Sequence, residues 1–450
     1  MRRIAFLRVA AASSLAWAAR PGLAQRSRYG GTLVMETRAK TSALEPNDSS
    51  IDLRRLAASV FEGLVGRDEM GVVRPQLATE WSHDPQRRRW QFTLRSQVKT
   101  HEGSMLTAAQ VAGALSGLLS PRVVSAAADT VTIQSDQSEP GLIEDLAEPR
   151  FRLSWKNAAG ALSGTGPFRV ADWVAGQRGV LSAHDGHWQG RPYLDAIEVR
   201  LGRTLRDQLF DFEGGRADVV ELSAVDSRRQ GGLAGRGVWS SASLDLVALV
   251  FVRNRPGVQD ERVRRGIALS IDRGPIVQVL LQRLGEAAGS FLPQRVSGYG
   301  FLFGMDRDLE RARQQLMPAP PALVLGYDAA EPSLRLIAER IALNARDAGA
   351  TLKPSSTDTS DMVLTRVPAL ATEPGLALVE YGRGLQMPLP AFGRRREDVW
   401  QAERKSLLGS WVVPLFHVPS TYGVLSRVRN WVKPGAVWWR LDEVWLEGRR

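Results

Sequence analysis

The spacing of hydrophobic residues changes along the chain between a helical period and a strand period. Between residues 53 and 64, apolar side chains recur on one face of a predicted helix, with Asp52 as the expected N-cap. Further on, Trp90, Phe92 and Leu94 alternate with polar residues, which is the pattern of a half-buried strand. The chain is therefore predicted to mix helices and strands.

Residues that mark the ends of helices support this interpretation. Thr107 and Gln110 have the spacing of a capping box, and Asp260 stands where it can cap another helix. A helical stripe over residues 334–345 is followed by Gly349, a residue type that commonly ends helices. These signals predict three helices with defined starts or ends.

The rest of the pattern and the length of the chain predict the number and type of domains. Residues 31–35 predict a strand, whereas residues 121–160 and 286–305 are predicted to be rich in loops. No repeat with a period of 20–50 residues is visible. A length of 450 residues then predicts two or three domains of mixed α and β structure.

The N-terminus has the features of a secretory signal peptide. Arginines open the chain, an apolar run covers residues 9–19, and small residues precede Gln25. This run is too short to span a bilayer. We expect cleavage of residues 1–24 and an exported, periplasmic protein. The chain has no cysteine, so disulfides, thiolate metal sites and a lipid-modified cysteine are excluded.

The basic charge does not indicate a nucleic-acid partner. The formal charge is +11, and the predicted cleavage lowers it to +7 because four arginines are removed. Only six of the 59 basic residues are lysines, and the arginines are scattered along the chain. One basic cluster, the three arginines at residues 394–396, is followed at once by two acids. This distribution favours a solvated surface over a nucleic-acid groove.

No catalytic constellation is visible. His184 and His187 have a spacing found in metal sites, but the intervening Gly186 favours a surface loop. The nucleophile-elbow and phosphate-loop motifs are absent. Trp438 and Trp439 are adjacent and cannot both face one side of a strand, so one of them is expected at an exposed position or a lobe contact. We expect no enzyme activity, cofactor or metal.

Several words occur in an order typical of one family. They are Phe61-Glu62-Gly63-Leu64, Pro75-Gln76-Leu77-Ala78-Thr79-Glu80-Trp81, Phe92-Thr93-Leu94-Arg95, Thr107-Ala108-Ala109-Gln110-Val111, Gly164-Thr165-Gly166-Pro167-Phe168 and Pro414-Leu415-Phe416-His417. The chain resembles the family 5 extracellular solute-binding proteins, the peptide- and nickel-binding components of ABC importers. This resemblance covers most of residues 29–435.

The resemblance implies an α/β, two-lobed periplasmic-binding-protein fold of type II, cluster C-like, with an additional subdomain and an interlobe cleft. Lobe I would comprise residues 29–45, 160–245 and 425–450. The additional subdomain would comprise residues 46–159, and lobe II residues 246–424. The lobes would close on a ligand by a hinge motion.

The family's peptide binders hold the ligand's amine with an aspartate that follows a strand. That strand corresponds here to residues 361–366, and continuing in register places Leu370 at the aspartate's position and Glu373 at its Asp-Pro word. A buried ammonium without a counter-charge would cost several kcal/mol. Peptides with free amines are therefore expected to bind weakly. A second alignment makes Glu380 the counterpart of the missing acid.

The resemblance places the ligand-binding candidates at Glu45, Arg366, Phe416, His417 and Tyr422. An arginine at 366 would suit an anionic group if it faced the cleft. We expect a monomer that captures a peptide-like or other organic solute and delivers it to an inner-membrane ABC permease. Two alternatives remain open: a descendant with a degenerate pocket that acts through protein contacts, and a secreted hydrolase.

Overall fold

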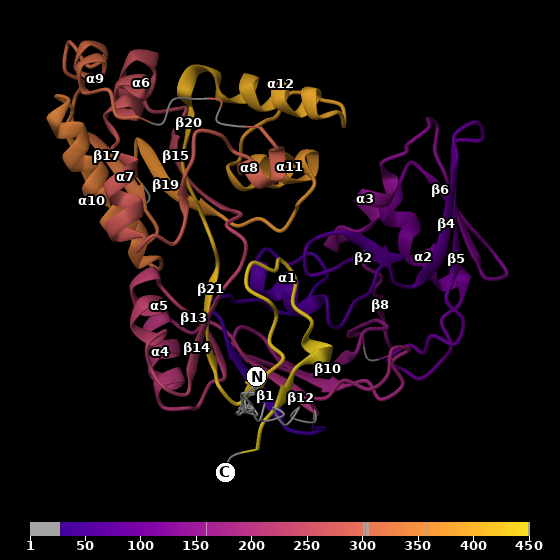
Figure 1. The fold of residues 1–450 in the computed structure, drawn as a ribbon. Helices are drawn as coiled ribbons and strands as arrows, with labels where there is room; N and C mark the ends of the chain where they lie inside the picture. The colour runs from indigo at the N-terminus through magenta and orange to yellow at the C-terminus, as the bar shows by residue number, and fades with distance from the viewer. Residues whose placement is uncertain (1–27, 159, 300–301, 303–305, 358, 449–450) are drawn as a thin grey trace, which may run out of the picture.

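The computed structural model describes residues 28–158, 160–299, 302, 306–357 and 359–448. The predicted signal peptide and its cleavage site lie outside these residues. Within them, none of the helices combines the length and the apolar character needed to cross a membrane. The described chain forms two lobes and a subdomain (Figure 1).

Lobe I is built around a seven-stranded sheet. Its central strand β1 is parallel to both neighbours, and its other strand pairs are antiparallel. The strand order is β10 (Phe168–Val174), β11 (Arg178–Ala183), β12 (Ala196–Arg200), β1 (Thr32–Glu36), β13 (Val219–Glu221), β21 (Thr421–Leu425) and β14 (Arg236–Ser240). The helices of this lobe are α1 (Ile51–Ala57), α4 (Leu205–Glu213) and α5 (Ala224–Gln230).

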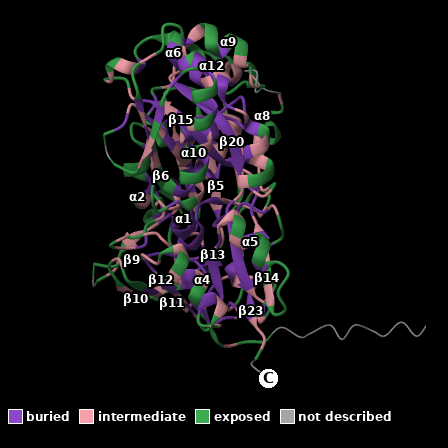
Figure 2. Cartoon of the chain, turned by 90° about the vertical axis from the view of Figure 1, so that its left-hand side faces the viewer, coloured by how far each residue is buried: buried purple, intermediate pink, exposed green. Residues whose placement is uncertain are grey.

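Lobe II is built around a six-stranded sheet. The strand order is β16 (Glu286–Ala287), β20 (Val412–Val418), β15 (Asp245–Phe251), β19 (Met362–Val367), β17 (Leu323–Tyr327) and β18 (Leu352–Ser355). The main helices are α6 (Glu261–Ser270), α9 (Leu309–Gln315), α10 (Pro332–Asp347), α11 (Pro374–Gly384) and α12 (Arg396–Leu407), with short helical segments α7 (Arg273–Pro275), η3 (Ile276–Leu280) and α8 (Gln294–Ser297). In Figure 2 the strands β15 and β20 are largely buried, whereas α6, α9 and α12 carry many exposed residues.

The subdomain contains a four-stranded antiparallel sheet. Its strands, in order, are β4 (Ala78–Asp84), β5 (Arg89–Leu94), β7 (Thr130–Gln134) and β6 (Val123–Ala127). Its other elements are the hairpin of β2 (Val65–Arg67) and β3 (Val73–Pro75), the helices α2 (Ala108–Leu119) and α3 (Leu142–Leu146), and the strand pair β8 (Trp155–Lys156) and β9 (Leu162–Ser163). Leu115, Phe92 and Ile133 meet in its separate core.

Most of the predicted elements are confirmed. Residues 31–35 fall on β1 and Trp90 to Leu94 on β5. Thr107 and Gln110 form a complete capping box at the start of α2. Asp260 caps α6, and the predicted stripe over residues 334–345 lies in α10.

The first helix differs from its prediction. α1 ends at Ala57, and its N-cap is Ser50, which accepts a hydrogen bond from the backbone N–H of Leu53. Asp52 is thereby released from capping and turns toward other groups. The apolar residues that continue the helical stripe, Val60 and Phe61, follow the helix in a turn and are buried in the core of lobe I.

Three further differences concern element types and boundaries. Residues 121–134 form the strands β6 and β7 rather than loop. β6 is the exposed edge strand of its sheet, so its sequence lacks the inward apolar residues that would have marked it. Strand β21 pairs with β13 and β14 in lobe I, although residues 421–424 were assigned to lobe II, and α1 packs in the core of lobe I rather than in the subdomain.

The chain passes between the two large sheets twice, from β14 to β15 and from β20 to β21. These two crossings are tied together. The backbone N–H of Ser241 donates to the carbonyl oxygen of Ser420 at 2.9 Å, and the N–H of Ser420 donates to Ser241 Oγ at 3.0 Å. Two hydrogen-bonded crossings, side by side, therefore connect the lobes.

Candidate functional site

A cleft of about 430 Å³ lies beside the paired crossings. Lobe I contributes the end of β1, the start of α1 and the end of β13. Lobe II contributes the start of α10 and the end of β19. The cleft therefore lies between the lobes, where the ends of strands from both sheets meet (Figure 1).

Arg38 joins the two sides of this cleft. It follows β1 in lobe I, and its Nε lies 2.7 Å from Glu221 Oε2 at the end of β13. Its Nη1 reaches across to lobe II, 3.1 Å from Glu331 Oε2. The guanidinium is therefore neutralised by two carboxylates, one from each lobe.

The second arginine of the cleft, Arg366, is also occupied. Its Nη2 lies 2.6 Å from Asp245 Oδ2 and donates to the carbonyl oxygen of Pro419 at 3.0 Å. Glu331 Oε2 lies 3.7 Å from Arg366 Nη1. Asp245 is buried at the start of β15, so this arginine is bound to the crossing strands themselves.

Asp52 is the most perturbed carboxyl group of the cleft. Its oxygens accept hydrogen bonds from the Tyr422 hydroxyl and from Thr37 Oγ1, and Arg55 Nη1 lies 3.8 Å away. Burial, reinforced by the nearby charge of Glu221, raises the pKa of Asp52 to about 6. Asp52 is therefore mostly ionised at neutral pH and becomes protonated in mild acid.

The lining of the cleft carries more carboxylates than cations. The carboxylates are Asp52, Glu221, Asp245, Asp328 and Glu331, and the guanidiniums are Arg38 and Arg366. Both guanidiniums are held by carboxylates within the cleft. Asp328 is exposed, and the only hydrogen bond that its side chain makes among the described residues is from the Ala330 backbone N–H. The cleft consequently presents net negative charge to a solute.

The structure brings two of the five predicted site residues to the cleft. Arg366 and Tyr422 line it. Phe416 and His417 lie on β20 and are buried in lobe II. His417 Nε2 is 2.8 Å from the carbonyl oxygen of Phe291, and burial lowers the pKa of His417 to about 4. Glu45 is exposed and is not among the residues that line the cleft.

The environment of Leu370 accounts for the absence of an acid there. Leu370 is buried in the apolar core that includes Tyr381. Its backbone N–H donates to Glu380 Oε2 at 2.9 Å, and the other oxygen of Glu380 pairs with Arg54 of lobe I. Glu380 therefore joins α11 to α1, and its carboxylate is already engaged.

The histidine pair lies in a loop, but this loop is not a surface feature. His184 and His187 are 7% and 6% exposed. His187 Nε2 lies 3.3 Å from Glu62 Oε1, the same oxygen that accepts from Trp188 Nε1. Among the described residues, no group of three or more histidines and acids is arranged to hold a metal ion. His187 therefore contacts the buried carboxylate of the Phe-Glu-Gly-Leu word, whereas His184 Nδ1 lies 3.1 Å from the carbonyl oxygen of Gly166.

Sequence reasoning missed most of the cleft. Arg38, Asp52, Glu221, Asp245 and Glu331 belong to five different elements, and no local motif joins them. The one signal available in the sequence was the position of these residues at the ends of predicted elements. Most of them directly follow or begin a buried strand or helix, where ligand sites of α/β folds are commonly found.

With this geometry established, comparison with known proteins identifies the family. The profile described as "Bacterial extracellular solute-binding proteins, family 5 Middle" matches residues 72–380, more than half of the chain. The chain belongs to this family. The resemblance to this family is thereby confirmed.

Three curated relatives show the breadth of the family. SapA of Salmonella typhimurium, a peptide transport periplasmic protein, is 29% identical over 144 residues, covering 30% of this chain and 25% of SapA. The nickel-binding protein NikA of Staphylococcus aureus is 23% identical, with coverages of 40% and 39%. The oligopeptide-binding protein AppA of Bacillus subtilis is 22% identical, with coverages of 60% and 55%. The chain spans between a quarter and just over half of these relatives.

Solved structures show the fold along almost the whole chain. A dipeptide-binding protein from Pseudoalteromonas sp. SM9913 in complex with Met-Leu has a TM-score of 0.81 at 15% identity, covering 93% of this chain and all of that one. NikA of S. aureus in complex with Ni(L-His)2 has a TM-score of 0.80 at 16% identity, covering 92% and 100%. The fold is the two-lobed periplasmic-binding-protein fold. These relatives and structural neighbours are described as binding or transport proteins.

Proposed function

We propose that this family 5 protein is the exported solute-binding component of an ABC importer, and that its interlobe cleft captures a small organic solute bearing a cationic group. The observation that carries the choice of solute is the charge of the cleft. Five carboxylates face two guanidiniums, and the guanidiniums are already paired. An amine or guanidinium group would relieve this imbalance.

The occupied state of Arg366 argues against an anionic solute. An incoming carboxylate would have to displace Asp245, whose own carboxylate is buried and would lose its partner. Leaving a buried charge unpaired is strongly unfavourable. Asp328, in contrast, is exposed at the cleft and has no ion pair among the described residues. It is therefore the carboxylate most readily available to a cation.

A peptide-like solute would bind here differently from the pattern that the family resemblance implies. Leu370 lies in the core and Glu380 is held by Arg54, so neither position offers a carboxylate for a terminal amine. Asp328, which has no ion pair among the described residues, is the acid of the lining that can take this role. A short peptide or amino-acid derivative with a basic side chain fits a volume of about 430 Å³.

The experiment is calorimetry with a charge-matched panel of solutes. The panel contains arginine, lysine, basic dipeptides with free and acetylated amines, and neutral and acidic counterparts of the same size. We expect saturable binding confined to the cationic members. In Asp328→Asn, affinity for the best of them should fall roughly fivefold, which corresponds to about 1 kcal/mol.

Asp136→Asn is the matched control, because Asp136 is an exposed aspartate of the subdomain and does not line the cleft. This variant should bind as the unmodified protein does. Binding of acidic solutes in preference to cationic ones would overturn the proposed solute class. Absence of binding across the whole panel, extended by a thermal-shift library, would favour the alternative of a descendant with a degenerate pocket.

A further inference from the structure

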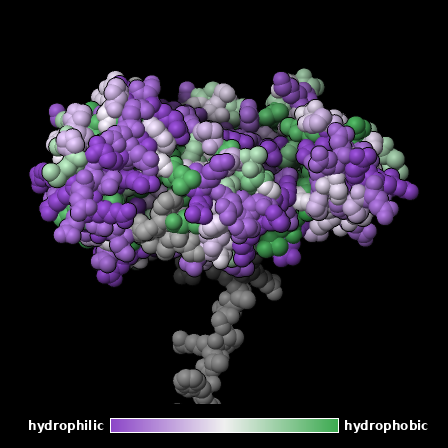
Figure 3. All heavy atoms as spheres, turned by 90° about the horizontal axis from the view of Figure 1, so that it is seen from above, coloured by the Kyte–Doolittle hydropathy of each residue, from purple (hydrophilic) through white to green (hydrophobic). Residues whose placement is uncertain are grey.

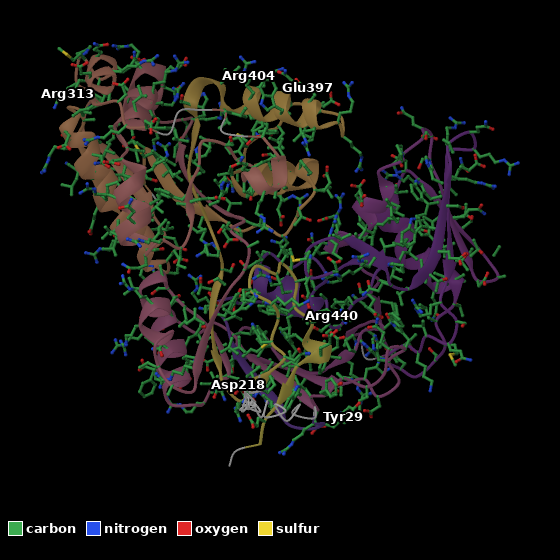
Figure 4. The ribbon with its side chains drawn as sticks, viewed as in Figure 1. Tyr29, Asp218, Arg313, Glu397, Arg404 and Arg440 are labelled. Carbon is green, nitrogen blue, oxygen red and sulfur yellow. The ribbon has the colours of Figure 1, made fainter. Side chains whose placement is uncertain are left out.

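A second cavity, of about 200 Å³, lies where the subdomain meets lobe I. Its lining comes from the end of α1, the β2–β3 hairpin, the loop at residues 187–189 and the C-terminal segment 438–442. It shares no lining residue with the interlobe cleft. Arg440, labelled in Figure 4, belongs to this C-terminal segment.

The lining contains one arginine without a carboxylate partner. Arg67 pairs with Glu148, Arg74 with Asp68, and Arg440 with Asp442. For Arg152, no ion pair is found among the described residues. The one hydrogen bond that its guanidinium makes within the described chain is from Nη1 to the carbonyl oxygen of Arg54 at 3.0 Å. Burial lowers the pKa of Arg152 to about 9, so the guanidinium is still charged at neutral pH.

Further donors of the lining are also unpartnered. Trp438 and Trp439 are each 4% exposed, and neither indole Nε1 has a hydrogen-bond partner within the described chain. The Nε of Arg67 is also buried and has no hydrogen-bond partner within the described chain. The guanidinium carbon of Arg152 lies 4.7 Å from the centre of the Trp438 ring. Several N–H groups without acceptors thus belong to residues that line one cavity, and buried donors normally find an acceptor.

The acids of this lining do not supply the missing acceptors. Glu62 accepts from Thr165 Oγ1 at 2.7 Å and from Trp188 Nε1 at 3.0 Å. Asp68 and Asp442 are held by their own arginines. Among the described residues, Arg152 is therefore the one cation of this lining without a carboxylate within ion-pair distance, and the charge of Glu148 acts on it from farther away. Within the described chain, Glu62 has only His187 within ion-pair distance. A small anion would both neutralise Arg152 and accept the free N–H groups.

We propose that this cavity is a binding site for a small oxyanion, either a carboxylate or an inorganic tetrahedral anion, with Arg152 as its charged partner and Trp438 as a hydrogen-bond donor. The volume equals that of about six water molecules in the liquid. It is sufficient for acetate, phosphate or sulfate together with some water. The proposal does not depend on which solute the interlobe cleft takes.

The test is calorimetry with sodium acetate, sodium phosphate and sodium sulfate at constant ionic strength, with sodium chloride as the balancing salt. We expect saturable binding of at least one of these anions, and the one that binds most tightly identifies the source of the oxyanion. Arg152→Met keeps an unbranched stem but removes the charge, so affinity should fall at least tenfold. Arg152→Lys keeps the charge but loses the planar fork and should be intermediate.

Trp438→Phe removes the indole N–H while keeping an aromatic ring beside Arg152, and it should weaken binding about threefold to tenfold. Arg253→Met is the matched control, because Arg253 lies 4.7 Å from the Trp411 ring, is exposed and is outside this cavity. Circular dichroism and melting temperature establish that each variant is folded. Asp328→Asn, which tests the interlobe cleft, should leave anion binding unchanged.

Two results would overturn the proposal. The first is the absence of saturable binding of any of the three anions to the unmodified protein. The second is equal affinity in Arg152→Met and in the unmodified protein. Either result is independent of the calorimetry with cationic solutes, so failure of the anion site and failure of the proposed solute class are distinguishable.

Discussion

At the scale of single residues, the properties of the cleft depend on which charges are already satisfied. Arg366 lines the cleft as expected, but Asp245 occupies its guanidinium. Asp52, in contrast, lines the cleft although it was not expected there. Its predicted role was a helix cap, yet Ser50 performs that role, and Asp52 instead faces the cleft with a raised pKa. The residue type alone therefore did not predict the charge available to a ligand.

The first prediction concerns the pH dependence of binding. Because the pKa of Asp52 is raised to about 6, lowering the pH from 7 to 5 protonates it and removes one negative charge from the cleft. If a bound cation requires the ionised carboxylate, its association constant should fall roughly tenfold over this range. Calorimetry with the best cationic solute at several pH values measures this change.

Asp52→Asn supplies the comparison for this prediction. It should bind the cationic solute more weakly at pH 7 and should lose most of the change between pH 7 and pH 5. An unchanged pH profile in this variant would show that another group controls the titration. Melting temperatures at both pH values show whether the substitution also destabilises the protein by removing the charge beside the buried Arg55.

At the scale of elements, the family words are explained by close packing of backbone against backbone. The segment that follows α1 lies directly against the Gly-Thr-Gly-Pro-Phe turn before β10. The backbone N–H of Gly166 donates to the carbonyl oxygen of Val60 at 3.0 Å, and the N–H of Phe168 donates to that of Ser59 at 2.9 Å. A Cβ at position 166 would lie 2.5 Å from the Ser59 carbonyl oxygen. Glycine is required there because no side chain fits.

The second prediction compares two Gly→Ala substitutions. Gly166→Ala should destabilise the protein by about 2 kcal/mol or more, because the neighbouring backbone must move. Gly113→Ala, at an exposed position of α2 with no atom near its Cβ, should be neutral or stabilising by up to about 1 kcal/mol. Melting temperatures of the two variants provide the measurement. Equal melting temperatures would contradict the close-packing explanation.

At the scale of the whole molecule, the arrangement of the lobes depends on a few charged contacts around the hinge. Arg38 pairs with Glu331, Arg54 with Glu380, and Asp145 of the subdomain with Arg394 of lobe II. Hydrophilic side chains dominate the face of the molecule seen from above (Figure 3). Polar contacts of this kind are compatible with lobes that separate and rejoin around a solute.

The third prediction concerns this interlobe contact. Glu380→Gln removes the ion pair with Arg54. In this pair the Arg54 side chain is 12% exposed and the Glu380 side chain is 18% exposed. The loss should be about 1 kcal/mol and should shift the balance toward the open form roughly fivefold. Small-angle scattering of the ligand-free protein should then give a larger radius of gyration.

Glu397→Gln is the control for the scattering experiment, because Glu397 lies exposed on α12 (Figure 4) and bonds only to Gln401 of its own helix within the described chain. It should leave the radius of gyration unchanged. Separately, a saturating cationic solute should reduce the radius of gyration of the unmodified protein. Identical scattering with and without that solute would contradict hinge closure.

The sequence by itself determined the elements whose signals are local, and with them the family. The capping box of α2, the alternation along β5 and the stripe of α10 depend on neighbouring residues, so each could be recognised in a short window. The order of the family words then implied the two-lobed fold. The edge strand β6 was not predicted, because an exposed strand has no need of inward apolar residues.

Only the tertiary structure decided the membership of the cleft and its charge. Arg38 and Glu331 are 293 residues apart in sequence, and Arg366 and Asp245 are 121 apart, so no local pattern records their contacts. The same holds for Arg152, whose lack of a carboxylate partner depends on how the subdomain packs against lobe I. Electrostatic interactions act through space between groups that folding brings together, and their sign and strength follow from burial and from partners that the linear order does not contain.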